Sequence, residues 1–545
     1  MRHSRRDNFM LSGGHGSVLR IIVVAAMLAA LIPCFYAIRA ATAKAGAADD
    51  GRPGTSPAFG HGIPPAAQGE IALIEQEIQQ TEAQTLQLLG TSMDSMHQIQ
   101  TLGKLELFDA SLSVNKQEAC SFCHMPEVGY TGRSEVLNLT TVAYPGSVRT
   151  RFSDRKPMSY TYATLAPVLH YNATQKDFYG GNFWDMRATG WKLQSPAAEQ
   201  AQGPPTNPVE MGLPDSACVA YRLATGKYVS LFQQIWGNAI SLISWPSNAE
   251  KVCTTPAGAG GVGPQLSLSA EDRDRANTIY DEFALSIAAY EASPSVNAFS
   301  SKFDAYLANS ATLTPQEQHG YELFNTTGKC NTCHLSGLAN GVTGGTPTDV
   351  APLFTDFTSS NLGLPKNYAI PYLYESTPDQ YGYVANPQGL AYVDMGVGAF
   401  LDGLTVPDQS WAALAPQFLG KMQVPTLRNV DQRPFPHFAK AYMHNGYLKS
   451  LKEVVHFYNT RDHQCSSPND PGARFTCWPA PEDADNEDTT VGALGLSDSD
   501  ENDIVAFLKT LTDGYMPVGT MSGKLNAAIQ AEAASLRRRS PHSGN

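Results

Sequence analysis

The stretch Cys120-Ser121-Phe122-Cys123-His124 decides the fold, because Cys-x-x-Cys-His is the attachment signal of a c-type haem. The two thiols can add to the porphyrin vinyl groups, and the adjacent histidine can ligate the iron from one face. A second copy, Cys330-Asn331-Thr332-Cys333-His334, lies far downstream. The chain is therefore predicted to carry two covalently bound haem c groups, attached through Cys120, Cys123, Cys330 and Cys333 and ligated by His124 and His334.

A sequence echo precedes the two haem motifs. Gly103-Lys104-Leu105-Glu106-Leu107-Phe108 lies before the first motif, and Gly320-Tyr321-Glu322-Leu323-Phe324 lies before the second. A helix with a Leu-Phe pair that leads into a loop and then into the haem motif indicates a duplicated cytochrome c fold. Period-two alternation is scarce, so the predicted fold class is mainly α. We expect two cytochrome c-like domains with long irregular loops, at residues 97–300 and 301–515.

Capping residues and periodicity predict individual helices. Apolar residues at helical spacing predict an amphipathic helix from about Glu70 to Leu89 and another helix that begins near Ser269. Thr314-Pro315-Gln316-Glu317 is a capping box with proline at the first helical position. Ser497 is expected to cap the last helix, which should stop at Gly514.

The N-terminus is typical of an export signal. Basic residues precede an apolar run at residues 21–38, and small residues follow it. Residues 1–43 are therefore predicted to be a cleaved signal peptide or an uncleaved membrane anchor. We expect residues 44–96 to form a linker and the N-terminal helix, and residues 516–545 to form a tail. Export together with covalent haem indicates that the protein is located in the periplasm.

Charge and cysteine content narrow the range of partners and the compartment. The formal net charge of the 545-residue chain is -13, which argues against nucleic acid and favours a basic partner.

Cys34 belongs to the leader, so four cysteines remain outside the haem motifs. An even remainder in an exported protein suggests disulfides, although free buried thiols are the alternative. Nearest-neighbour pairing predicts Cys218 with Cys253 and Cys465 with Cys477.

Further motifs, taken together in this order, resemble the dihaem bacterial cytochrome c peroxidases and their relative MauG. The resemblance covers about residues 100–515. Each motif alone is weak, but the set is highly specific. The motifs are Leu102-Gly103-Lys104 with Phe108-Asp109 and Leu112-Ser113; Phe183-Trp184-Asp185 with Arg187-Ala188; Gln200-Ala201 with Gly203-Pro204; Asn207-Pro208-Val209-Glu210-Met211; Pro425-Thr426-Leu427-Arg428-Asn429; and Tyr442-Met443-His444-Asn445-Gly446.

The resemblance implies unequal roles for the two haems. The haem of His124 would react with peroxide, and the haem of His334 would store or relay electrons. Glu210 matches the family's distal acid, whereas an isolated glutamate in such a loop would be an ordinary carboxylate. Trp184 matches a tryptophan between the haems. Gln200 and Pro204 match pocket-lining positions, although six extra residues separate them from Trp184 relative to the usual pattern.

Two departures from the typical peroxidase pattern concern iron ligands. The loop at residues 125–144 contains no histidine, so the first haem is expected to be five-coordinate or water-bound. His170, the next histidine, is interpreted as a packed core or propionate-contacting residue. Counting from His444 places Tyr458 where peroxidases have methionine and MauG has tyrosine, which makes Tyr458 the predicted second ligand of the other haem. The competing ligands are His456 and Met443.

The resemblance also implies a calcium ion between the two domains, held partly by backbone carbonyls just before Tyr442. Extra residues between Arg433 and Lys440 alter that approach, so the sequence assigns no calcium ligands.

The function implied is that of an exported peroxidase that reduces H2O2, with a small cytochrome c or cupredoxin as electron donor. One alternative is a MauG-like maturase that oxidises side chains of a partner protein. The non-enzymatic alternative is a dihaem electron-transfer cytochrome, which has no use for an open iron beside Glu210.

Overall fold

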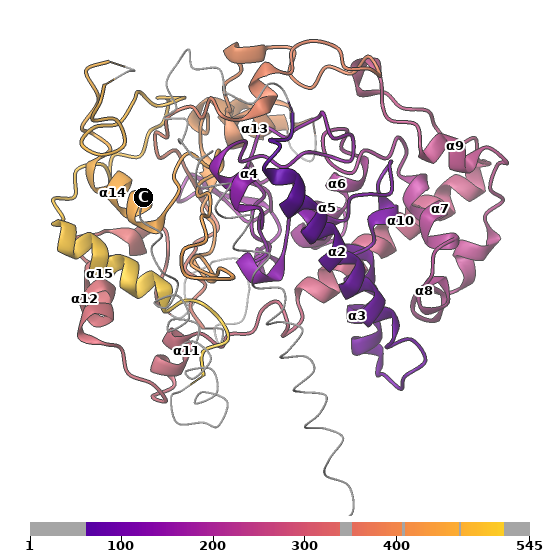
Figure 1. Ribbon diagram of the computed structural model, residues 1–545, viewed down its shortest axis with the longest axis horizontal. Helices are drawn as coiled ribbons and strands as arrows, with labels where there is room; N and C mark the ends of the chain where they lie inside the picture. The colour runs from indigo at the N-terminus through magenta and orange to yellow at the C-terminus, as the bar shows by residue number, and fades with distance from the viewer. Residues whose placement is uncertain (1–61, 338–350, 406–408, 468–469, 517–545) are drawn as a thin grey trace, which may run out of the picture. The chain divides into compact units, whose positions relative to one another are not determined.

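The computed structural model describes residues 62–337, 351–405, 409–467 and 470–516. This part of the chain is mainly helical, and its strands form two short antiparallel pairs (Figure 1). None of its helices has the length and apolar character needed to cross a bilayer. The predicted leader, most of the linker and nearly all of the tail lie outside the described residues. The helices are α2 (Ala67–Leu86), α3 (Ser95–Leu107), α4 (Glu135–Leu139), α5 (Pro196–Ala201), α6 (Gly203–Thr206), α7 (Ala217–Ala224), α8 (Val229–Trp236), α9 (Ala249–Cys253), α10 (Ala270–Glu291), α11 (Lys302–Leu307), α12 (Pro315–Asn325), α13 (Gly396–Asp402), α14 (Leu451–Thr460) and α15 (Asp498–Lys509); the strands are β1 (His170–Asn172), β2 (Asp177–Tyr179), β3 (Ser359–Ser360) and β4 (Met422–Gln423).

The first helix lies slightly upstream of its predicted bounds. Helix α2 buries Ile71, Ile74 and Ile78, which are the apolar positions that predicted it. Its last turn stops before Leu88, whose side chain is 45% exposed. The helix therefore ends where its apolar face no longer has a core to pack against.

Helices α3 and α10, which precede and follow the first haem motif in the sequence, cross each other. A glycine makes the crossing close. A Cβ atom at Gly103 would lie 1.9 Å from the carbonyl oxygen of Ser286. Only glycine permits backbones to approach this closely. Helix α10 begins after Ser269, whose hydroxyl accepts a hydrogen bond from the backbone N–H of Asp272, as its sequence predicts.

Helices α12 and α15, which lie side by side in Figure 1, cross in the same way. A Cβ atom at Gly320 would lie 1.9 Å from the carbonyl oxygen of Asp503. The glycines of the sequence echo are therefore equivalent contact points in the two halves.

The capping boxes at Thr314 and Ser497 both form. Helix α15, however, ends at Lys509 and so stops before the predicted Gly514.

Separate hydrophobic cores surround the two haem motifs. The first core contains Phe122 of the first motif together with residues of α3 and α10. The second contains Phe324 and Phe507 of the crossing helices, and Cys330 packs against it. One core for each motif is the arrangement expected of a duplicated cytochrome c fold.

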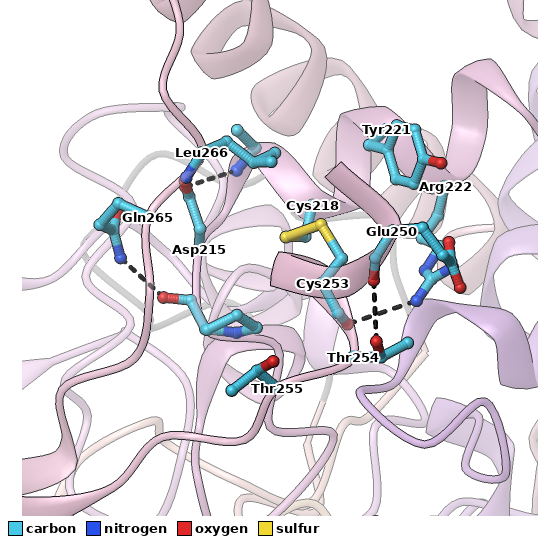
Figure 2. Close-up of a disulfide and its surroundings, with 12 residues drawn as sticks. Asp215, Cys218, Tyr221, Arg222, Glu250, Cys253, Thr254, Thr255, Gln265 and Leu266 are labelled. Carbon is cyan, nitrogen blue, oxygen red and sulfur yellow. Dashed lines mark hydrogen bonds and ion pairs between the residues drawn. A yellow bond between two sulfur atoms is a disulfide. The ribbon is translucent and has the colours of Figure 1, made fainter. Parts of the chain in front are cut away.

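Disulfides join the same cysteine pairs that nearest-neighbour spacing predicts. Figure 2 shows Cys218 of α7 bonded to Cys253 at the end of α9. Arg222 strengthens this corner, because its guanidinium donates to the carboxylate of Glu250 at 2.6 Å and to the backbone carbonyl of Cys253 at 3.3 Å. The second disulfide, between Cys465 and Cys477, closes a loop after α14.

Candidate active site

A cavity surrounds the first haem motif. The free thiols of Cys120 and Cys123 line it together with His124. Several residues singled out in the sequence line the same cavity, namely Trp184, Gln200, Pro204 and Glu210. The structure therefore brings together, around one motif, residues drawn from three separate stretches of the chain.

The two motif histidines are held in the same way. The Nδ1 nitrogen of His124 lies 3.0 Å from the carbonyl oxygen of Tyr130, and that of His334 lies 2.9 Å from the carbonyl oxygen of Phe354. A carbonyl oxygen only accepts, so Nδ1 carries the proton and Nε2 keeps its lone pair. Burial lowers the pKa of each imidazole to about 4, which keeps both rings neutral. Neutral imidazole is the form that ligates iron.

Glu210 is a carboxyl group poised for proton transfer. Burial raises its pKa above the ordinary value, while the nearby charge of Arg187 and a hydrogen bond from Asn207 oppose that rise. The side-chain amide of Asn207 donates to Oε1 at 2.8 Å and so orients the carboxylate. A buried glutamate with a raised pKa can both accept a proton and return it.

The long segment between Trp184 and Gln200 contains a loop whose backbone is held by hydrogen bonds to one carboxylate. The carboxylate of Glu199 accepts hydrogen bonds from the backbone N–H groups of Gly190, Lys192 and Leu193, each at 2.6 to 2.9 Å. The loop leads into α5, so Gln200 still reaches the cavity. The insertion therefore lengthens the connection without removing Gln200 or Pro204 from the site.

A second cavity surrounds the second motif, and Tyr458 of α14 lines it with His334 and both thiols of the motif. Burial raises the pKa of the Tyr458 phenol, so a phenolate there needs a cationic partner such as iron. Met443 lines the same cavity. His456 does not line it, because its Nδ1 pairs with Glu501 at 2.9 Å and its Nε2 donates to the carbonyl of Phe475 at 2.9 Å.

Trp184 lines both cavities. Its indole N–H donates to the backbone carbonyl of Lys156 at 3.0 Å. Its ring meets the imidazole of His444 edge to face, with 6.4 Å between the ring centres. Trp184 is therefore the predicted site residue that structurally connects the two haem sites.

The turns that carry Trp184 and His444 have the same backbone form. Isolated bridges close the turn at residues 182–188 and the turn at residues 442–448. Phe183 and Met443, at the same position of each turn, have φ angles of 69° and 70°. Trp184 and His444 follow them, so they occupy equivalent positions in the two halves. Sequence reasoning treated the two motifs as unrelated, because the two turns share no residue at equivalent positions.

His170 lies away from both haem cavities. It sits in β1, where its ring stacks on Tyr179 at 5.8 Å and its Nδ1 donates to the carbonyl of Val168 at 2.9 Å. It is absent from the lining of either cavity as far as the described residues extend. A contact between His170 and a haem propionate stays a prediction.

The donor set at each motif fits a covalently attached haem c. Each cavity presents two thiols that are not in disulfides beside a neutral histidine. These are the groups that covalent haem attachment and axial ligation require. Haem c bound at these positions would supply redox-active iron.

Comparison with known proteins places this donor set in a family. The sequence profile of the di-haem cytochrome c peroxidases matches residues 97–312. The methylamine utilization protein MauG of Paracoccus denitrificans (strain Pd 1222) is 31% identical over 421 residues, which span 76% of this chain and 88% of that protein. The chain belongs to the di-haem cytochrome c peroxidase family. It is thus an oxidoreductase of the peroxidase class with two haem c cofactors.

Other members of the di-haem peroxidase family are more distant. The cytochrome-c peroxidase IdrP1 of Denitromonas iodatirespirans is 25% identical over 417 residues, covering 75% of this chain and 80% of that protein. The crystal structure of the diheme peroxidase BthA from Burkholderia thailandensis E264 superimposes with a TM-score of 0.56 at 24% identity, covering 77% of this chain and 88% of that one. The latter likeness concerns the fold alone.

Sequence reasoning missed other charged residues at the first cavity. Arg155 makes a bidentate ion pair with Asp394, at 2.6 and 2.7 Å, and a further bond to Asp185 at 2.7 Å. Glu291, at the end of α10, lines the cavity, and burial raises its pKa to about 8. No motif signals these residues, because their role arises only from contacts between distant segments.

The family resemblance implied a calcium ion held partly by backbone carbonyls just before Tyr442, and this stays a prediction. The carbonyl of Ala439 accepts from the side-chain amide of Asn138 at 3.1 Å. The next residue is Lys440, whose ammonium lies among backbone carbonyls. Among the described residues, no group of three or more histidine, cysteine or acidic side chains could hold a metal ion.

Proposed function

We propose that this chain is an exported peroxidase that reduces H2O2 in the cavity of Cys120 to His124 and shares oxidising equivalents with the second haem site. The observation that carries this proposal is the placement of Glu210 and Trp184 around one haem motif, with Trp184 reaching the other cavity. Peroxide reduction needs one protein group that transfers a proton and one that passes electrons. Glu210 and Trp184 are suited to these two roles.

Glu210 supplies the proton transfer. Reduction of one H2O2 to two water molecules consumes two electrons and two protons. The Glu210 carboxylate can take the proton from one peroxide oxygen and return it to the other, which then leaves as water. Asn207 holds Oε1 of Glu210 in place, and the charge of Arg187 favours the ionised carboxylate by opposing the rise in its pKa that burial causes.

Trp184 supplies the link between the two sites. Both electrons must reach one cavity, so a second redox group nearby lets the oxidising equivalents be shared. The indole of Trp184 lies against His444 and lines both cavities, which suits it to pass one electron at a time. Tyr458, as an anionic oxygen ligand, would lower the potential of the second haem and favour its oxidation.

The first haem is expected to have an open position in the resting enzyme. His124 is the only histidine among the described residues that line the first cavity. Met211 also lines it but lies against the thiol of Cys120, with 3.7 Å between the sulfur atoms. An electron paramagnetic resonance spectrum of the oxidised holoprotein should show one high-spin ferric signal. Two low-spin signals would contradict the proposal.

A second candidate function is MauG-like oxidation of side chains on a partner protein. The 31% identity to MauG and the position of Tyr458 at the second cavity favour it. Stopped-flow addition of H2O2 to the diferric protein should rapidly bleach the ferric Soret band in both cases, whereas an unreactive protein would be an electron carrier. Turnover with reduced cytochrome c then separates a peroxidase from a maturase.

Export to the periplasm is part of the proposal. The leader-like N-terminus and the Cys218–Cys253 and Cys465–Cys477 disulfides support it, because such bonds persist in oxidising compartments. Fractionation of the expressing bacterium should recover the haem-stained protein in the periplasmic or membrane fraction. Recovery in the cytosol would contradict export.

A further inference from the structure

Glu118 is a buried carboxyl group at the first cavity that the proton transfer described above does not use. It lies just before the first haem motif, its side chain is 3% exposed, and it lines the same cavity as Glu210. The guanidinium of Arg149 donates to Oε2 of Glu118 at 3.1 Å. Within the described ranges Arg149 is the only hydrogen-bond partner of this carboxyl group, so Oε1 is left to carry a proton.

Hydrogen bonds hold the loop of Glu118 against the loop of Glu210. The backbone N–H of Ser147 donates to the carbonyl of Glu210 at 2.7 Å. The side-chain amide of Asn115 donates to the carbonyl of Ser147 at 2.8 Å, and the N–H of Asn115 donates to the Ser147 hydroxyl at 3.1 Å. Asn115 belongs to the same short loop as Glu118. The two carboxyl groups therefore come from loops whose backbones are fixed relative to each other.

The charge of Glu210 acts on Glu118. Burial raises the pKa of Glu118 well above its ordinary value, the charge of Arg149 opposes the rise, and the charges of Glu210 and Glu75 add to it. Ionised Glu210 thus helps to keep a proton on Glu118. Burial, followed by the charges of Glu118 and Glu210, also raises the pKa of the Cys123 thiol, so both carboxyl groups lie near this thiol. Once haem is attached the thiol no longer titrates, and Arg149, Glu75 and Glu210 are the charged groups that act on Glu118.

Arg149 connects Glu118 to the surface of the molecule. Its Nη2 donates to Oε1 of Glu75 in α2 at 2.8 Å. The exposed fraction of the side chain falls from 35% at Glu75 to 22% at Arg149 and 3% at Glu118. A guanidinium stays protonated, so Arg149 holds the two carboxyl groups in place and does not itself carry the proton. A row of charged groups thus leads from solvent to the first cavity.

Complete reduction of H2O2 needs more protons than Glu210 moves by itself. Glu210 transfers a proton that the peroxide already holds, so cleavage of the O–O bond and release of the first water take no proton from solvent. The two electrons that arrive afterwards are accompanied by two protons, and these complete the second water. The first cavity therefore needs a group that takes protons from solvent and delivers them inside.

We propose that Glu118 delivers these protons to the first cavity through Glu210. In each delivery the O–H bond of Glu118 breaks and an O–H bond forms on the Glu210 carboxylate. Glu118 then regains a proton from solvent on the side of Glu75. No electron moves in this step, since both electrons come from the donor of the proposed peroxidase. The inference rests on the proposed function and adds a residue that acts through Glu210 without touching the peroxide.

The first test asks whether Glu118 carries a proton in the diferric holoprotein. The infrared spectrum of the parent minus that of Glu118→Gln should show the C=O band of one protonated carboxylic acid at neutral pH. The band should shift to lower frequency in D2O. Absence of the band would mean that Glu118 is ionised and paired with Arg149, which would overturn the proposal. This measurement does not depend on activity.

The second test uses stopped flow to separate the two stages of the cycle. In Glu118→Gln, bleaching of the Soret band by H2O2 should be slowed far less than in Glu210→Gln. The return of the ferric band after addition of a reductant should slow by about 10²-fold. An unchanged return rate would overturn the role of Glu118 and leave that of Glu210 intact. A parent protein that H2O2 does not bleach would instead contradict the proposed function.

Glu106→Gln is the matched control. Glu106 is another fully buried glutamate of the first half, and burial raises its pKa well above the ordinary value. It does not appear among the described residues that line the first cavity. The control variant should lose a carboxylic acid band and keep the parent's return rate. Equal slowing in both variants would show that loss of any buried carboxyl group is enough, which would overturn the proposal.

A conservative variant guards against a fold defect. Glu118→Asp keeps the carboxyl group, so it should recover much of the return rate that Glu118→Gln loses. Should Glu118→Gln fail to attach haem, the parent protein still decides the proposal. Its return rate should fall as the pH rises, because Glu118 must hold a proton to deliver it. A parent rate that does not change with pH would contradict proton delivery by Glu118.

Discussion

Glu210 is the residue whose removal should separate chemistry from haem binding. Glu210→Gln keeps the shape and the hydrogen bond to Asn207 but cannot carry the proton. We expect the rate of reaction with H2O2 to fall by about 10²- to 10⁴-fold, with both haems retained. Stopped-flow absorbance measures this. Asn207→Asp leaves the proton carrier in place and should have a smaller effect, and an unchanged rate in Glu210→Gln would reject the role of Glu210.

Tyr458 should be visible in the spectrum of the second haem. Tyr458→Phe removes the phenol oxygen from the cavity of His334 while keeping the ring that packs against the second core. The electron paramagnetic resonance signal of the second haem should shift, and its reduction potential should rise. His456→Gln is the control, because His456 bonds elsewhere. A spectrum that changes in the control and not in Tyr458→Phe would exclude ligation by Tyr458.

Met186 shows how packing tolerates a side chain at a left-handed backbone position. Its φ angle is 60°, and the equivalent position in the other turn is Gly446 with a φ of 59°. A side chain in this left-handed region costs about 1 kcal/mol relative to glycine. Met186 is fully buried in a cluster with Leu169 and Phe178, which offsets the strain. Only the packing explains how a methionine is tolerated at this position.

At the scale of elements, the two glycine crossings should be equally sensitive. Gly103→Val and Gly320→Val each place a Cβ against a carbonyl oxygen at 1.9 Å, which would push the crossing helices apart. We expect a loss of about 1–3 kcal/mol or more for each variant, with weakened packing around the nearest haem motif. Chemical denaturation followed by Soret absorbance measures it.

The exposed glycine Gly69 on α2 provides the control for these variants, since a Cβ there meets nothing within 4 Å. Gly69→Ala should be neutral or slightly stabilising. Equal stability of all three variants would show that the close crossings do not limit the packing.

Element boundaries followed local chemistry closely where a cap was present. Ser269, Thr314 and Ser497 begin helices because their side chains satisfy the first backbone N–H groups, and this information is local. The end of α15 did not follow the glycine signal, because Thr510 closes the helix before Gly514. The repeat of the Trp184 and His444 turns was invisible in sequence, since the two share backbone form rather than residue identity.

At the scale of the whole molecule, the free energy of unfolding should depend on pH through Glu291. The pKa of Glu291 is raised from 4.5 to about 8 by burial, so the folded state keeps a proton that the unfolded state releases. Its contribution is fully present below about pH 4.5 and is lost as the pH rises through about 8. Glu291→Gln should therefore gain stability relative to the parent between pH 5 and pH 8.

Melting temperatures of both dihaem proteins, measured at half-unit steps across that range, test the linkage. The difference should widen with rising pH and level off above about pH 8. A difference that is constant with pH would show that Glu291 ionises normally. Glu282→Gln is a comparison, because burial raises the pKa of Glu282 only to about 7 and its difference should level off earlier.

The sequence by itself determined the chemistry that depends on near neighbours: the haem attachment at Cys120 to His124 and Cys330 to His334, the capped helix starts and the short-range cysteine pairs. Only the tertiary structure decided the contacts that join the halves, such as Trp184 against His444 and Lys440 among the carbonyls of Val128, Val430 and Gln432. The reason is physical. The chemistry of a motif depends on side chains that are adjacent in the sequence. A cage of backbone carbonyls leaves no pattern of side chains in the sequence, because it exists only after distant loops have packed together.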